Sequence, residues 1–190
     1  MTQIIYNTAT SLDGFLADNN NSLAWLFAVD QTGAPNNDEF MSHIGVLVQG
    51  STTYEWVLQE TQLLERPDQW QNFYGDRPSF VFTSRELPVP LGADVRFLRG
   101  RVEDHLKTIR QAASGKDIWV MGGGDLVGQF ADAGALNRIE VTVAPVTLGS
   151  GAPLLPRAIG ADRLTLIEAA QYGQFANLVY EVDTRVNNLG

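Results

Sequence analysis

The sequence predicts an α/β fold in which a mixed, mostly parallel sheet carries helices on both faces. Short apolar runs of strand length alternate with helix patterns through the first two thirds of the chain, an order typical of parallel sheets. Several of these runs are almost continuously apolar, as expected of strands buried on both faces. The last third holds two strand patterns joined by a turn, which predicts an antiparallel pair. Together the patterns predict about eight strands and about four helices.

Length and composition fit one globular domain that spans residues 1–190, with 44% apolar residues. The chain has no cysteine, which excludes disulfides, thiolate metal sites and cysteine nucleophiles. Its two histidines, His43 and His105, lack the spacing of metal ligands. We therefore predict no metal site.

The formal net charge is −9. Binding to DNA or RNA depends on dense Lys and Arg that neutralise phosphates, so neither nucleic acid nor an anionic membrane is an expected partner. The first residues do not resemble a secretory signal, and no apolar run reaches the length that spans a bilayer. We expect a cytoplasmic protein that acts on a small molecule.

The first strand pattern covers residues 3–10 and stops before the turn dipeptide Asp13-Gly14. A polar cluster, an aromatic patch at 25–27 and a short helix at 36–43 follow. Residues 45–50 form a buried strand, after which three hydroxyl residues start a second helix.

The later elements continue this alternation. Val102, Leu106, Ile109 and Ala113 form one apolar stripe of a helix. The expected strands are 79–83, 94–98, 117–121, 138–144, 164–169 and 177–183, and the expected helices are 101–114 and 125–133.

The strongest chemical signal is the triple glycine Gly122-Gly123-Gly124, which joins a buried strand directly to a helix. A helix N-terminus offers unpaired N–H donors and a partial positive charge, and glycine allows close approach of an anion. Val127 stands where a dinucleotide fingerprint needs its last glycine, and the turn lacks the lysine of a P-loop. The glycines indicate either a phosphate site or tight packing of the helix on the strand.

Two further strand ends carry groups that suit an anion. Gly50-Ser51-Thr52-Thr53 places hydroxyls at a helix start, where ordinary capping explains them equally well. Thr83-Ser84-Arg85 combines two hydroxyls with a guanidinium, which binds phosphate in a bidentate manner but is also a common surface group. Three such ends in one sheet favour a shared anionic ligand.

The motifs SLDG, GSTTYE, TSR, VMGGGDL and APVTLGSGAPLLP occur in this order. This ordered set of motifs resembles the dihydrofolate reductase-like family. It is most similar to the branch that contains the C-terminal reductase domain of the bifunctional riboflavin-biosynthesis deaminase-reductase. The resemblance covers residues 3–183 and implies a stand-alone reductase domain with a three-layer sandwich around an eight-stranded sheet. It also implies NADPH as the cofactor and hydride transfer to a pterin or a pyrimidine.

The resemblance assigns roles by position. Asp13 faces the substrate, orienting it or assisting its protonation, together with Ser11 and Trp25. The implied cofactor residues are Gly122, Gly123, Gly124, Asp125, Leu126 and Val127 at the pyrophosphate, Gly50, Ser51, Thr52 and Thr53 at the second turn, Thr83, Ser84 and Arg85 at the adenosine ribose and its 2′-phosphate, and Ala9, Leu16 and Ala17 at the nicotinamide.

Two positions depart from the family pattern. Ser51 stands where the family usually has an arginine for the 2′-phosphate, so NADH remains open beside NADPH and Arg85 is the remaining cation. Ala24 stands before Trp25, where related reductases often carry aspartate.

The resulting hypothesis is an NAD(P)H-dependent reductase of a small heterocycle, by resemblance of the 5-amino-6-(5-phosphoribosylamino)uracil reductase or dihydrofolate reductase type. The sequence shows no dedicated site for the phosphate of that uracil. The alternatives are a catalytically silent nucleotide-binding module and a reductase of aromatic or quinone acceptors, with Trp25, Phe27 and Tyr54 lining its pocket. The resemblance further implies a homodimer, joined through a sheet edge or the last strands.

Overall fold

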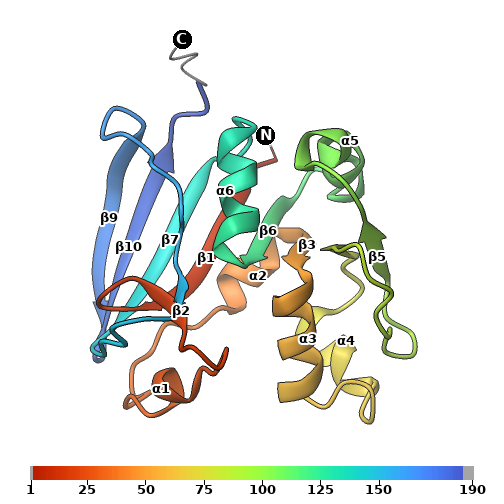
Figure 1. The fold of residues 1–190 in the computed structure, drawn as a ribbon, viewed down its shortest axis with the longest axis horizontal. Helices are drawn as coiled ribbons and strands as arrows, with labels where there is room; N and C mark the ends of the chain where they lie inside the picture. Colours follow the sequence, from red (N-terminus) through yellow and green to blue (C-terminus); the bar gives the residue numbers. More distant parts are fainter. Residues whose placement is uncertain (1, 186–190) are drawn as a thin grey trace.

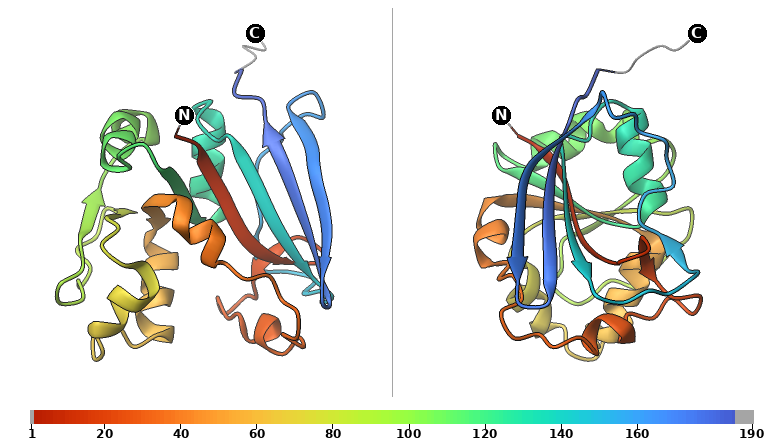
Figure 2. Two further views of the ribbon diagram at one scale, coloured as in Figure 1. Left: turned by 180° about the vertical axis from the view of Figure 1, so that it is seen from behind. Right: turned by 90° about the vertical axis from the view of Figure 1, so that its left-hand side faces the viewer.

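The computed structural model describes residues 2–185, which form the expected α/β fold in three layers (Figure 1). The strands of the main sheet are β1 (Ile4–Ser11), β3 (Ile44–Gly50), β4 (Ser79–Phe82), β5 (Val95–Leu98), β6 (Asp117–Gly122), β7 (Arg138–Ala144), β9 (Leu164–Tyr172) and β10 (Phe175–Val182). Their order is β5-β4-β3-β6-β1-β7-β10-β9, with β9 and β10 at one edge and β5 at the other (Figure 2).

The sheet is mixed and mostly parallel, as predicted. Strands β1, β3, β4, β5, β6 and β7 pair in parallel, whereas β10 runs antiparallel to both β7 and β9. The carboxyl ends of β3, β6 and β1, which are neighbours in the sheet, therefore open at the same edge.

The two faces of the sheet hold separate cores, because side chains alternate along each strand. Ile118 and Val120 pack with α5 (Val102–Ala112) and α6 (Gly124–Asp132). Trp119 points to the opposite face, which is covered by α2 (Asp38–His43), α3 (Ser51–Glu60) and α4 (Asp68–Tyr74). This gives the three layers that the resemblance implies.

The expected number of about four helices is too low, since the described residues form six. The additional helices are α1 (Ala24–Phe27) and α4. With four residues, α1 is too short to show a helical period. In α4 only Trp70 and Tyr74, four residues apart, are buried, and the three residues between them, including Phe73, are exposed.

Two smaller differences concern strands. A two-stranded ribbon of β2 (Phe15–Ala17) and β8 (Ala152–Pro153) was not predicted, because neither segment is long enough to show alternation. Strand β9 continues to Tyr172, three residues beyond the expected strand 164–169, so the turn lies at Gly173 and Gln174. Within residues 2–185 we find no helix long and apolar enough to cross a membrane.

Candidate functional site

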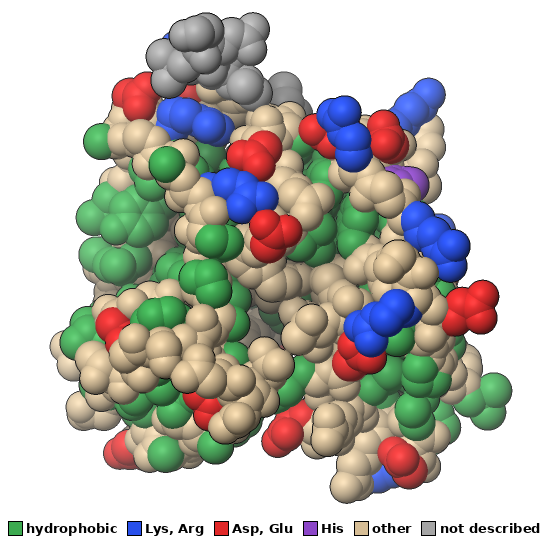
Figure 3. All heavy atoms as spheres, viewed as in Figure 1, with side chains coloured by type: hydrophobic (Ala, Val, Ile, Leu, Met, Phe, Trp, Pro, Cys, Tyr) green, Lys and Arg blue, Asp and Glu red, His purple; other side chains and the backbone are tan. Residues whose placement is uncertain are grey.

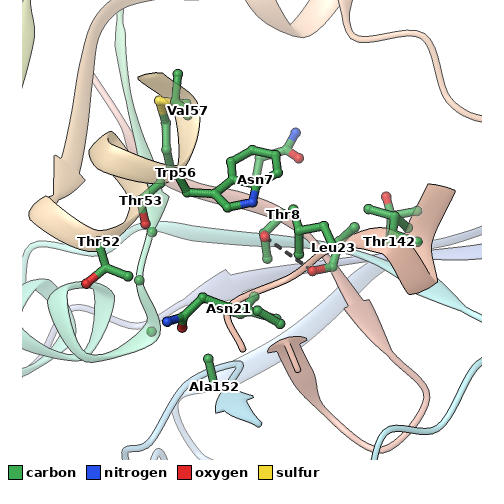
Figure 4. Close-up of a pocket in the computed structure, with 18 of the residues that line it drawn as sticks. Asn7, Thr8, Asn21, Leu23, Thr52, Thr53, Trp56, Val57, Thr142 and Ala152 are labelled. Carbon is green, nitrogen blue, oxygen red and sulfur yellow. Dashed lines mark hydrogen bonds between the residues drawn. The ribbon is translucent and has the colours of Figure 1, made fainter. Parts of the chain in front are cut away.

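A cavity of about 730 Å³ opens at the carboxyl ends of β1, β3 and β6. Ligands of open α/β sheets collect at these ends. Figure 4 shows the cavity between α3, which carries Thr52, Thr53 and Trp56, and the strands that carry Asn7 and Thr142. A surface view shows a hollow in this part of the molecule (Figure 3). The cavity is large enough for a cofactor or substrate of ordinary size.

Two helices begin at this cavity. The N-cap of α3 is Gly50 and that of α6 is Gly123, and no described side chain caps either start by a hydrogen bond. The first N–H groups of a helix have no partner within the helix. A Cβ built on Gly50 would lie 3.8 Å from both Gly122 O and Gly123 N, so the two turns touch. The positive ends of two helix dipoles therefore meet at one place, an arrangement suited to an anion.

The three glycines of the turn have different reasons to be glycine. Gly122 has φ +141°, a conformation that favours glycine, and its peptide bond to Gly123 is cis. A Cβ on Gly124 would lie 2.5 Å from the carbonyl oxygens of both Pro153 and Leu154. A Cβ on Gly123 would meet no atom within 4 Å. Both sequence interpretations thus apply, with tight packing at Gly124 and free space for a ligand at Gly123.

Arg157 fastens the segment after β8 onto α6. Its guanidinium pairs with Asp125 and with Asp132, at 2.9 Å in each case. The pKa of Asp125 is lowered, first by a hydrogen bond from Gln129 and then by Arg157. The positive charge beside the glycine turn is therefore already matched by carboxylates.

The structure brings many of the expected cofactor residues together around the cavity. Gly50 and Ser51 stand at the start of α3 without lining the cavity, and Leu126 and Val127 are buried residues of α6 that do not line it either. The expected residues that line the cavity are Ala9, Leu16, Ala17, Thr52, Thr53, Gly122, Gly123, Gly124 and Asp125.

The third strand end lies outside the cavity lining. Thr83, Ser84 and Arg85 follow β4, and Thr83 Oγ1 accepts a hydrogen bond of 3.0 Å from the Arg85 backbone N–H. The Arg85 guanidinium forms an ion pair with Glu55 of α3 and donates to Glu55 Oε1 at 3.0 Å. Arg85 is thus partnered within the protein.

Asp13 and Ser11 join two segments that are distant in the sequence. The Asp13 carboxylate accepts hydrogen bonds from Ser11 Oγ at 2.6 Å and from the backbone N–H groups of Leu148 and Gly149, the latter at 2.7 Å. The Ser11 bond, and then these N–H groups, lower the pKa of Asp13. Neither Asp13 nor Ser11 lines the cavity. The geometry shows a clamp between the β1–β2 turn and the loop after β7, and a role in catalysis stays a prediction.

Of the three aromatic residues considered for the pocket, Phe27 lines the cavity. Tyr54 is completely buried, and its hydroxyl donates to Pro88 O at 2.7 Å. Trp25 lies in α1 beside Leu26 and Phe27, which line the cavity, but is not itself part of the lining.

Several lining residues were not identified from the sequence. Trp119 follows from strand alternation once the two faces of β6 are known, and Asn7 carries the one amide side chain of β1. For Trp56 the sequence predicts a place in a helix, but no motif indicates that it lines a cavity. The lining residues missed in this way include Asn7, Trp56, Trp119, Thr142 and Phe175.

A polar chain runs from the cavity into the sheet. Asn7 Nδ2 donates to Glu140 Oε2 at 2.9 Å, and Glu140 Oε1 lies 2.9 Å from Arg138 Nε. Burial raises the pKa of Glu140, an effect that Arg138 and Asn7 oppose and that Glu168 and Asp117 reinforce. The Asn7 backbone carbonyl accepts a hydrogen bond of 2.9 Å from Trp119 Nε1. Asn7 and Trp119 are thereby held in place relative to each other.

The raised pKa of Glu140 predicts a pH dependence of stability. The pKa of Glu140 in the folded state lies above its ordinary value of 4.5, so over the window between the two the folded state retains a proton that the unfolded state has released. Stability falls as the pH rises through this window. We expect the free energy of unfolding of the wild type, relative to Glu140→Gln, to fall as the pH rises above 4.5 in urea titrations. A difference that is constant or rises with pH contradicts this assignment.

Among the described residues, no group of three or more His, Cys, Asp and Glu side chains is placed to hold a metal ion.

Comparisons with known proteins identify one matching family and two relatives of similar length. The model of the RibD C-terminal domain matches residues 2–176. The uncharacterized protein YwjB of Bacillus subtilis (strain 168) is 30% identical over 172 residues, which cover 90% of this chain and 93% of YwjB. The uncharacterized protein YyaP of the same organism is 24% identical over 155 residues, or 80% of this chain and 79% of YyaP.

Solved structures share the fold. A putative riboflavin biosynthesis protein from Shewanella sp. PV-4 superposes with a TM-score of 0.75 at 23% identity, covering 96% of this chain and 99% of that one. RibD of Acinetobacter baumannii gives 0.63 at 19% identity, with 96% of this chain and 58% of RibD aligned. A Thermotoga maritima deaminase/5-amino-6-(5-phosphoribosylamino)uracil reductase gives 0.61 at 13% identity, with 95% and 56% aligned. At these identities the likeness concerns the fold.

Proposed function

The chain belongs to the RibD C-terminal domain family, and on this premise we propose that it is a reductase that takes hydride from a reduced pyridine dinucleotide, NADPH or NADH, to a small heterocycle. The observation that supports it most is the meeting of two uncapped helix starts at the cavity, beside a glycine that leaves space. The names of the Shewanella and Acinetobacter proteins are the support for a substrate of the riboflavin-biosynthesis type.

The residues present fit a dinucleotide. Its pyrophosphate is an anion, and the N–H groups at the start of α6 and the hydroxyls of Thr52 and Thr53 would hold it. The free space at Gly123 accommodates such a group. When bound, the cofactor supplies a hydride, and the reduced substrate takes up a proton from solvent.

The other walls of the cavity would position the substrate. Trp56 and Trp119 offer flat apolar surfaces, and Phe27 and Leu26 come from the α1 segment on the opposite side. These side chains exclude water from the reacting groups, and Asn7 at the sheet orients the ring by hydrogen bonding.

A second candidate function is a nucleotide-binding module without turnover. One observation favours it: among the described residues, Asp125 is the sole ionisable side chain in the cavity lining, and it is paired with Arg157. A module of this kind binds the dinucleotide and reduces nothing.

Two measurements on the purified protein separate these functions. Titration with NADPH and NADH, followed by reduced-nicotinamide fluorescence, tests binding; we expect saturation with at least one of them. Acceptor-dependent loss of nicotinamide absorbance with pterins, pyrimidines and quinones then tests turnover. Binding without turnover on any acceptor supports the module, and binding of neither nucleotide refutes both functions.

Cofactor preference should depend on Arg85 and Glu55. If Arg85 meets the 2′-phosphate, Glu55 competes for its guanidinium, because the two already form an ion pair. We expect Arg85→Ala to weaken the binding of NADPH about tenfold relative to that of NADH, because one charge-assisted hydrogen bond to the 2′-phosphate is lost. Glu55→Gln should strengthen the binding of NADPH severalfold, because the competing carboxylate is removed. The ratio of the two dissociation constants measures this. An unchanged ratio in both variants removes Arg85 from the 2′-phosphate site.

We also propose a homodimer joined through β9. This strand lies at the sheet edge and exposes Leu166 and Ile167. An exposed edge strand with apolar side chains readily pairs with another chain. Light scattering should give twice the 20.8 kDa of one chain, and the double variant Leu166→Lys, Ile167→Glu should give the monomer mass. A monomeric wild type contradicts the proposal.

A further inference from the structure

The walls of the cavity carry no positive charge. All thirteen Lys and Arg residues and both His residues fall within residues 2–185, and none of these described side chains lines the cavity. The one ionisable lining residue in that range is acidic, Asp125. A phosphorylated substrate would therefore have no cationic side chain to meet it.

The basic residues behind these walls are already partnered. Arg157 holds Asp125 and Asp132, Arg85 holds Glu55, and Arg138 lies against Glu140. Figure 3 shows basic side chains on this face beside acidic ones, around the hollow and not within it. The pair of Arg138 with Glu140 has the most buried carboxylate of these, so freeing Arg138 for a phosphate would leave a buried charge unpaired, which opposes binding.

One place at the cavity does suit an anion, namely the paired starts of α3 and α6. Under the proposed function the cofactor pyrophosphate occupies it. A second phosphate, carried by the substrate, would lie elsewhere in the cavity. There it would lose water without gaining a cation, and an unpaired buried charge is costly.

The rest of the lining suits a flat, uncharged ring. Trp56, Trp119, Phe27 and Phe175 supply aromatic surface. Thr142 adds a hydroxyl, and Asn7 adds an amide whose Nδ2 donates to Glu140. Asn7 lines the cavity and its amide nitrogen is committed in this way, so its Oδ1, to which no described group donates, is the side-chain atom free to accept a hydrogen bond. This acceptor matches a ring N–H.

We propose that the substrate is an uncharged, flat nitrogen heterocycle that carries no phosphate and whose ring N–H donates to Asn7. The inference rests on the proposed function for the position of the cofactor. The proposed substrate differs from the phosphoribosylamino-uracil in the name of the Thermotoga enzyme, although the two proteins share a fold. Glu140 acts here as a positioning residue, because it orients Asn7 and lies behind it.

A matched pair of ligands tests the proposal. The full chain, with saturating NADP⁺, is titrated with 5-amino-6-(ribosylamino)uracil and with its 5′-phosphate, and binding is followed by the fluorescence of Trp56 and Trp119, which line the cavity. We expect the uncharged compound to bind at least about tenfold more tightly, the factor that 1.4 kcal/mol gives at 25 °C. Equal or tighter binding of the phosphate, or binding of neither, overturns the proposal.

A variant tests the acceptor separately. Asn7→Leu should weaken the binding of the uncharged compound about tenfold, as expected for one lost buried hydrogen bond, and leave the binding of NADPH unchanged. Asn37→Leu, at another lining asparagine, serves as the control and should change neither. Equal effects of the two variants remove Asn7 from the proposal, and the ligand pair stays decisive if Asn7→Leu does not fold. Loss of NADPH binding by the wild type refutes the proposed function instead, and so the two failures are distinguishable.

Discussion

Gly123→Val should lower the affinity for the reduced dinucleotide at least about 100-fold, the loss expected when two charge-assisted hydrogen bonds are removed. The reason is steric. A Cβ at Gly123 meets no protein atom within 4 Å, so the valine side chain extends into the space at the two helix starts where we place the pyrophosphate. Its backbone, with φ −76° and ψ 176°, is one that valine adopts readily.

The fold itself should not change in this variant. We expect the melting temperature of Gly123→Val to stay within about 2 °C of the wild type, as for other substitutions that meet open space. Fluorescence titration with NADPH and thermal unfolding, measured on the same preparation, check both statements. An unchanged dissociation constant means that the pyrophosphate does not lie at Gly123.

The neighbouring glycine should show the opposite result. Gly124→Ala places a Cβ 2.5 Å from the carbonyl oxygens of Pro153 and Leu154, and these are backbone atoms that cannot rotate away. The segment must move from α6, and the hydrogen bond of 2.9 Å from Tyr6 Oη to Leu154 O is lost with it. Overpacking and one buried hydrogen bond together cost about 2–4 kcal/mol.

For a chain of this size that loss lowers the melting temperature by about 10 °C. Gly123→Ala is the matched control, since it adds the same methyl group one residue earlier, where there is space. Differential scanning calorimetry of the two variants measures the contrast. If both melt together with the wild type, the close approach of β8 to α6 does not constrain the turn.

The sequence predicted the main sheet, and it singled out the glycine turn that lines the cavity, for physical reasons. Strand β3 is buried over most of its length, and β6 alternates between buried and partly buried residues, so both carry an apolar run that is easily recognised. The triple glycine was informative because few other residues allow both the conformation of Gly122 and the close packing at Gly124. Periodicity and turn chemistry are local properties, which a single sequence retains.

What the sequence could not predict depends on contacts between distant segments. Asp13 resembles a substrate residue by its motif, yet its carboxylate engages Leu148 and Gly149, more than 130 residues later. The ion pair of Arg85 with Glu55 joins the end of one strand to a helix that starts after another. Short segments such as β2 and β8 form strands because they pair with each other, and neither pattern alone indicates it.

The most direct measurement of the central claim is a crystal structure of the complex with NADPH. We expect the pyrophosphate against Gly123 and the N–H groups at the start of α6, with Thr52 and Thr53 on its other side. A nucleotide bound elsewhere, or a pyrophosphate that does not contact the turn at residues 122–124, contradicts the account.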